Sequence, residues 1–116
     1  MRLDHVQLPM PPGREVDADL FYRDLLGLTP VAKPENLASR GGRWYGAGPL
    51  GVHLGVEEDQ RPSKKTHVCF VVEDYEALVQ RLETAGFVTS PDSELVGVVR
   101  CYVHDPFGNR IELQRG

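Results

Sequence analysis

Three histidines and one glutamate stand at repeated positions in the two halves of the chain. His5 opens one apolar, strand-like segment, and His67 opens a second one. His53 in the first half and Glu112 in the second half are each flanked by aliphatic side chains. Imidazole nitrogens and carboxylate oxygens are donors that proteins use to bind divalent zinc, nickel, iron or manganese. These four residues predict a metal-centred site for a small molecule.

The spacing of these residues indicates a duplicated module. His53 and Glu112 are separated by 59 residues, and the same offset separates Gly27 from Gly86, the glycines that end two helix-like segments. A constant offset across separate elements is the mark of an internal repeat. Corresponding strands of the two copies therefore carry the four candidate ligands.

Alternation along the strands decides which way these side chains point. Successive residues of a strand face opposite sides of its sheet. The aliphatic neighbours of His53 and Glu112 are expected to pack against the helices, which leaves both candidate ligands on the other face. The same alternation places His5 and His67 on that face. We expect the four side chains to line one concave surface.

Hydrophobic periodicity predicts an α+β protein in which each module is a strand, a helix, and two or three further strands. Asp17 and Asp74 are the expected N-caps of the two helices, and Gly27 and Gly86 their expected ends. The segment from Val31 onward is compatible with a loop or an edge strand. The remaining predicted strands are 3–8, 43–47, 50–56, 66–72, 100–104 and 110–114.

Length and composition limit the classes of protein. The 116 residues suit one domain, and each half alone would bury little apolar surface. The net charge of −4 disfavours nucleic acid as a partner, the apolar runs are too short for a membrane span, and two cysteines make no disulfide framework. We expect a cytoplasmic single domain over 1–116, with module 1 at about 1–57, a linker at 58–65 and module 2 at about 66–116.

Several polar or aromatic residues near the candidate ligands could contact a substrate. Arg43, Tyr45, Arg100 and Tyr102 lie on predicted strands and have the reach and hydrogen-bonding groups to orient a small molecule. Trp44 is expected to pack in the core.

Three segments carry a resemblance to a known family. They are Asp4-His5-Val6, the FYRDLLG run at 21–27 and the DPFGNRIE run at 105–112. With them the whole chain resembles the vicinal oxygen chelate superfamily, the glyoxalase/bleomycin-resistance/dioxygenase group. The resemblance implies two βαβββ modules that form an incomplete mixed-sheet barrel around a divalent metal, in a homodimer.

The resemblance also implies roles for the candidate ligands. His5, His67 and Glu112 match positions that hold metal ligands in the family, whereas the position of His53 varies among its members. It implies a metal-dependent lyase, isomerase or dioxygenase that binds a substrate through adjacent oxygens, with zinc, nickel, iron or manganese as a Lewis acid. If it can leave the metal, Glu112 is the expected general base, and His53 is either a fourth ligand or an acid/base group. The alternative is a metal-free protein that binds an antibiotic or another small molecule, as bleomycin-resistance proteins do.

Overall fold

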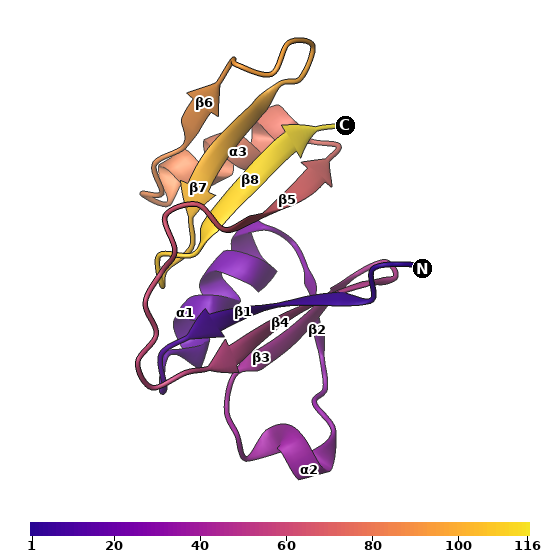
Figure 1. The fold of residues 1–116 in the computed structure, drawn as a ribbon, viewed down its shortest axis with the longest axis vertical. Helices are drawn as coiled ribbons and strands as arrows, with labels where there is room; N and C mark the ends of the chain where they lie inside the picture. Colours follow the sequence, from indigo (N-terminus) through magenta and orange to yellow (C-terminus); the bar gives the residue numbers. More distant parts are fainter. The chain divides into compact units, whose positions relative to one another are not determined.

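The computed structural model describes all residues from 1 to 116 and divides into two compact units (Figure 1). Unit 1 is Met1–Arg61 and unit 2 is Pro62–Gly116. The division falls within the charged, proline-containing stretch 58–65.

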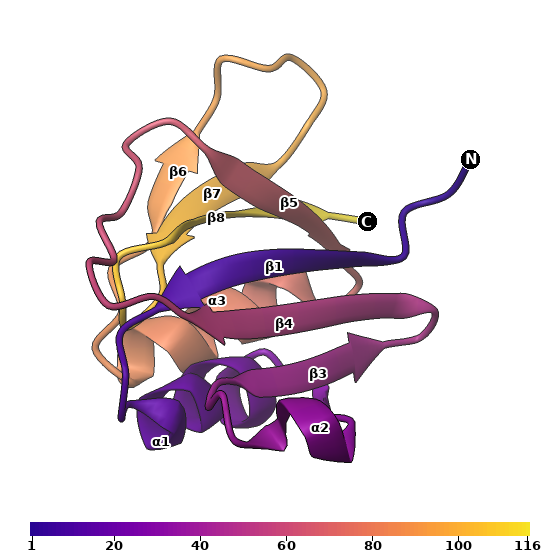
Figure 2. The same cartoon turned by 60° about the horizontal axis from the view of Figure 1, so that its bottom comes forward.

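Unit 1 is a four-stranded mixed sheet with its first helical segment on one face (Figures 1 and 2). Its strand order is β1-β4-β3-β2, with β1 parallel to β4 and the other neighbours antiparallel. The elements in chain order are β1 (His5–Met10), α1 (Glu15–Ala18), the π-helical segment η1 (Asp19–Leu25), β2 (Thr29–Val31), α2 (Glu35–Ala38), β3 (Arg43–Ala47) and β4 (Leu50–Val56).

Unit 2 repeats this topology. Its order is β5-β8-β7-β6, again with one parallel pair, β5 and β8. The elements are β5 (His67–Val72), α3 (Tyr75–Thr84), β6 (Ser90–Asp92), β7 (Arg100–His104) and β8 (Arg110–Arg115). Both sheets are open, and the prediction of an α+β fold built from two βαβββ modules is confirmed.

The two sheets also share their register. His53 on β4 lies opposite Gln7 of β1 and Trp44 of β3. Glu112 on β8 lies opposite Cys69 of β5 and Tyr102 of β7, which hold the corresponding places in unit 2. His53 and Glu112 are therefore equivalent positions on central strands, as a duplicated module requires.

Each unit buries the helix-facing side of its own sheet. The prediction that aliphatic neighbours of His53 and Glu112 face the core is confirmed, because all four are at most 1% exposed. These four residues are Val52, Leu54, Ile111 and Leu113. Phe21 and Tyr22 of η1 are fully buried in unit 1, and Leu78 and Leu82 of α3 are buried in unit 2. Burial of this apolar face is the main favourable term that holds the candidate ligands on the opposite face.

The helix boundaries match the prediction at their C-terminal ends and differ at one N-terminus. Gly27 and Gly86 follow the two helices with φ angles of +77° and +92°, which glycine adopts without strain. The first helical segment begins at Glu15, so Asp17 is not its N-cap. Asp17 instead accepts a 2.8 Å hydrogen bond from Arg14 within the first turn.

Short elements were not predicted. β6 and α2 have three and four residues, and β6 contains a proline, so neither has enough length for a periodic pattern. The segment left open around Val31 contributes the edge strand β2.

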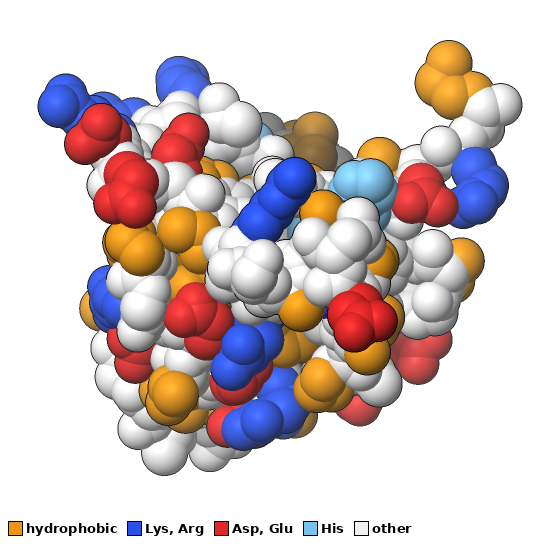
Figure 3. Space-filling view, turned by 90° about the horizontal axis from the view of Figure 1, so that it is seen from below, with side chains coloured by type: hydrophobic (Ala, Val, Ile, Leu, Met, Phe, Trp, Pro, Cys, Tyr) orange, Lys and Arg blue, Asp and Glu red, His pale blue; other side chains and the backbone are white.

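None of the helices has the length and apolar character needed to span a bilayer. Acidic and basic side chains are interspersed on the face drawn in Figure 3.

Candidate functional site

In unit 1 the candidate ligands form part of an aromatic stack. The ring of His53 on β4 stacks on His5 of β1, with centroids 4.5 Å apart, and on Trp44 of β3, with centroids 4.0 Å apart and planes 4° from parallel. Gly51 leaves room for this arrangement. A Cβ atom there would lie 3.0 Å from the His5 Cβ and 3.1 Å from the His53 Nε2.

In unit 2 the equivalent position is the centre of a charged cluster. Glu112 is only 5% exposed. Its carboxylate lies 3.1 Å from the Nε2 of His67 and accepts hydrogen bonds from the Cys69 thiol and an Arg100 Nη1, both at 3.4 Å. The Tyr102 hydroxyl donates a further hydrogen bond to it. Unit 2 therefore holds a buried, multiply hydrogen-bonded carboxylate where unit 1 has a stacked imidazole.

The second ring nitrogen of two histidines is fixed by a neighbour. The Nδ1 of His5 lies 2.9 Å from an Asp4 carboxylate oxygen. The Nδ1 of His67 lies 2.9 Å from the backbone carbonyl of Lys65. Metal-binding histidines have such a partner on the nitrogen that does not bind the metal, and it sets the ring orientation and leaves Nε2 as the donor.

The contact between His67 and Glu112 suits a ring proton or a metal ion shared by the two groups. The Lys65 carbonyl can only accept, so the Nδ1 of His67 carries a proton and donates it. In the neutral ring Nε2 is then an acceptor, yet it faces a carboxylate oxygen at 3.1 Å. Two acceptors at this distance repel unless Nε2 carries a second ring proton or both atoms bind one metal ion. The pair therefore fits a divalent metal in donor type and spacing.

Several groups hold the pKa of Glu112 below its ordinary value. Burial alone would raise this pKa, but the hydrogen bonds from Cys69 and Tyr102 and the charge of Arg100 outweigh the effect of burial. Partial desolvation of the thiol sulfur, together with the hydrogen bond to the Glu112 carboxylate and its charge, raises the pKa of the Cys69 thiol to about 11. Glu112 is thus an ionised acceptor at neutral pH, and Cys69 is a protonated donor.

The pKa of His53 is also shifted. Burial lowers it, the positive charges of His5 and Lys33 lower it further, and Asp4 opposes them. A neutral imidazole keeps the lone pair that a metal or a proton needs.

Arg100 and Tyr102, predicted to contact a substrate, both lie at the Glu112 cluster. Arg100 forms ion pairs with Asp92 and Glu112, each at 3.4 Å, and its Nε is buried without a hydrogen-bond partner. The guanidinium of Arg110 lies 3.9 Å from the centre of the Tyr102 ring.

Arg43 and Tyr45 occupy the other side of β3 from Trp44. Tyr45 is fully buried and its hydroxyl donates a 2.6 Å hydrogen bond to Asp19, which also accepts a 3.2 Å bond from Arg43. The position of Tyr45 is not compatible with the predicted substrate contact, because strand alternation turns it into the core. Trp44, expected in the core, is instead half-buried on the ligand face.

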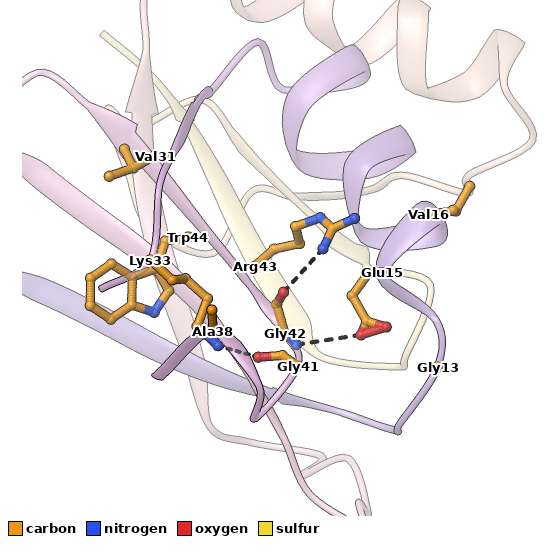
Figure 4. A pocket seen from close by; sticks show the side chains of 10 residues that line it. All are labelled: Gly13, Glu15, Val16, Val31, Lys33, Ala38, Gly41, Gly42, Arg43 and Trp44. Atoms are coloured by element: carbon orange, nitrogen blue, oxygen red, sulfur yellow. Dashed lines mark hydrogen bonds between the residues drawn. The ribbon is translucent and has the colours of Figure 1, made fainter. Parts of the chain in front are cut away.

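Two adjoining cavities lie in unit 1. The larger has a volume of about 600 Å³ and is bordered by Glu15, Lys33, Arg43 and Trp44 (Figure 4). The smaller has a volume of about 230 Å³ and shares Lys33 and Trp44 with the larger. Sequence reasoning missed Lys33, which stands in a segment without a periodic pattern.

Within each unit, the structure brings together two of the four predicted ligands. No group of three or more His, Cys, Asp or Glu side chains is arranged to hold a metal ion. His5 and His53 are the pair in unit 1, and His67 and Glu112 the pair in unit 2.

Comparison with known proteins gives consistent matches. The family model described as Glyoxalase/Bleomycin resistance protein/Dioxygenase superfamily matches residues 2–113. The chain is 32% identical to "Glyoxylase I 4" of Arabidopsis thaliana, over 86% of this chain and 64% of that protein, so it spans a little under two thirds of that relative. It is 35% identical to "Glutathione transferase FosA" of Serratia marcescens, over 83% of this chain and 69% of that protein.

A solved structure is also similar over the full length. It is the crystal structure of a protein from Bacillus anthracis assigned to the glyoxalase family, with a TM-score of 0.95 and 39% identity. The similarity covers 100% of this chain and 95% of that one.

Proposed function

The chain belongs to the Glyoxalase/Bleomycin resistance protein/Dioxygenase superfamily, and on this premise we propose that it is a metal-dependent enzyme. Its substrate is a small molecule that presents two adjacent oxygen atoms. The reaction is of the lyase, isomerase or dioxygenase class. The name of one relative, a glutathione transferase, makes glutathione-dependent reactions the first to assay.

The proposed metal ligands are His5, His53, His67 and Glu112. The observation that carries this proposal is the contact between the His67 Nε2 and the Glu112 carboxylate, at 3.1 Å with the other ring nitrogen already donating to a carbonyl. His5 supports it through the same anchoring of its Nδ1, here by Asp4. A divalent zinc, nickel, iron or manganese ion held by such donors supplies Lewis-acid stabilisation of an oxyanion.

The chain's own residues have separate tasks in this proposal. Glu112 is the general base when its carboxylate leaves the metal: its lowered pKa means that it is ionised at neutral pH, and the free carboxylate can accept a proton from the substrate. Tyr102 and Arg100 hold that carboxylate in place and offer donors to a substrate oxygen. His53 stays neutral and binds through its lone pair. Arg43 borders the larger cavity and can contact a substrate there.

Metal content tests the proposal. Purified protein, saturated with zinc, nickel, iron or manganese and then desalted, should retain about one metal ion per chain. His5→Ala, His67→Ala and Glu112→Ala should each lose it, while His104→Ala, at an exposed strand end, should not. Retention of the metal by a double variant of His5 and Glu112 would refute the site.

The proposal includes one functional domain over both units and a homodimer in solution. Light scattering should give a mass near twice the 12.9 kDa of one chain. A monomeric mass would remove the dimer from the proposal without affecting the ligand assignment.

The second candidate function is a metal-free small-molecule or antibiotic-binding protein. It is favoured by the cavities of unit 1, whose linings include none of the four proposed metal ligands. Saturable binding of a ligand such as bleomycin, unaffected by chelation and by Glu112→Ala, would favour it over the enzyme.

A further inference from the structure

The smaller cavity of unit 1 has a cationic border. Two of the residues that line it are Lys33 and Arg40, and no acidic residue does so. The rest of the lining is uncharged, and Leu37 and Gln7 belong to it. A volume of about 230 Å³ is below that of a typical whole-ligand pocket, so the cavity suits one group of a larger molecule.

The two cations are available to a ligand. Lys33 is half-buried and its ammonium donates one hydrogen bond, to the backbone carbonyl of Gly41, which leaves two of its three donors. Arg40 is exposed and forms no ion pair with any carboxylate. In the larger cavity, by contrast, the cations share the lining with the Glu15 carboxylate.

The cavity is next to the proposed ligand His53. Trp44 lines it and stacks on His53 with centroids 4.0 Å apart. Gln7 also lines it and is the strand partner of His53. Figure 4 shows Lys33 and Trp44 together on one side of the adjoining larger cavity, with Glu15 and Arg43 on the other. A molecule held at His53 can therefore extend past Trp44 to Lys33.

We propose that this cavity binds an oxyanion of the substrate, a carboxylate, phosphate or phosphonate, through Lys33 and Arg40. Arg40 can bind two oxygens at once with its planar guanidinium, and Lys33 adds a point charge. The claim that the bound group is part of a substrate rests on the proposed function, whereas the anion site itself does not.

Anion titrations of the whole protein test this site. Trp44 is the single tryptophan of the chain, so its fluorescence reports on the cavity it lines. Inorganic phosphate, methylphosphonate and acetate should each give saturable binding, confirmed by calorimetry, and acetamide should not. The tightest of the three identifies the anion chemistry. Lys33→Gln with Arg40→Gln should weaken this binding at least about tenfold. The control Lys64→Gln, at an exposed position, should leave it unchanged.

Two results would overturn the anion site: no saturable anion binding, or equal binding by the double variant and the wild type. The single variant Arg40→Gln is tested as well, because that side chain is exposed and its replacement should not disturb the fold. The titration is repeated on Glu112→Ala. Anion binding retained there, in a protein that has lost its metal, supports the site independently of the enzyme. If the wild type binds neither metal nor anion, both proposals fail; if it binds metal alone, only this one fails.

Discussion

The equivalent positions of the two sheets are held by different forces. In unit 1, His53 is held by flat contacts between rings, 4.0 Å from Trp44 and 4.5 Å from His5. In unit 2, Glu112 is held by charge-assisted hydrogen bonds, and Tyr102 occupies the strand position that corresponds to Trp44. Topology and register thus fix where a side chain projects, while its neighbours decide whether it behaves as a neutral donor or as a charged base.

The difference between the units also concerns rigidity. Stacked rings are attracted over a broad range of offsets, so the pair in unit 1 can adjust to a bound group. A carboxylate with several donors around it has a defined orientation. We therefore expect substitutions in the Glu112 cluster to have larger effects than matched substitutions in the His53 stack.

The largest expected difference between the units is in the stability lost when Glu112 or His53 is replaced by alanine. In metal-free protein, Glu112→Ala should lower the free energy of unfolding by about 2 kcal/mol, since several hydrogen bonds to a buried carboxylate are lost. His53→Ala should cost about 1 kcal/mol, the scale of an aromatic contact. Urea unfolding measures both. Equal losses would mean that stacking and hydrogen bonding hold the two positions equally well.

The alkylation rate of a cysteine should differ between equivalent positions on β1 and β5. Cys69 is exposed, but its thiol has a pKa of about 11 rather than the ordinary 9.0, so its alkylation by iodoacetamide at pH 8 should be about a hundredfold slower than that of an ordinary thiol. Gln7 holds the corresponding place in unit 1. A cysteine placed there by Gln7→Cys should react more than about tenfold faster, because no carboxylate lies opposite it. Similar rates would show that Glu112 does not control the Cys69 thiol.

Crowding of the stacked rings of His5 and His53 should have a smaller effect on stability. Gly51→Ala places a methyl group about 3 Å from both histidines and should cost roughly 1–2 kcal/mol on urea unfolding. The corresponding position in unit 2 is Arg110, whose guanidinium lies over the Tyr102 ring. Arg110→Ala removes a surface contact and creates no overlap, so its loss should be smaller. The reverse order would contradict the crowding at Gly51.

The smallest expected effect is a shift in the pKa of His53. In metal-free protein, NMR should place the pKa of His53 below the ordinary 6.5, and His5→Ala should raise it by removing a neighbouring positive charge. Because folding lowers this pKa, the stability that neutral His53 contributes is complete above pH 6.5. It falls as the pH drops from 6.5 towards the folded-state value. A pKa above 6.5 would contradict the burial and charge assigned to His53.

Much of the arrangement could be predicted from the sequence, because period-two alternation and a constant offset are local signals. The strands at 43–47, 50–56 and 100–104 match their predicted bounds. Faces were harder to assign for β3, where three polar or aromatic residues follow one another. Tyr45 turned out to be buried against Asp19, and Trp44 turned out to stack on His53. The sequence alone does not show which of two aromatic neighbours faces the core.

Lys33 was missed for a different reason. It lies between β2 and α2, two elements of three and four residues, where no repeating pattern places a side chain. Only the fold of this connection brings it to the Trp44 ring.

In the proposed metal site, the His67 Nε2 and the Glu112 oxygen, 3.1 Å apart, share either one proton or one metal ion. A proton and a metal ion would therefore compete for these two atoms, and a metal ion that binds there would displace the proton. Loading the protein in unbuffered solution should acidify the medium, and the apparent affinity for metal should increase as the solution becomes more alkaline.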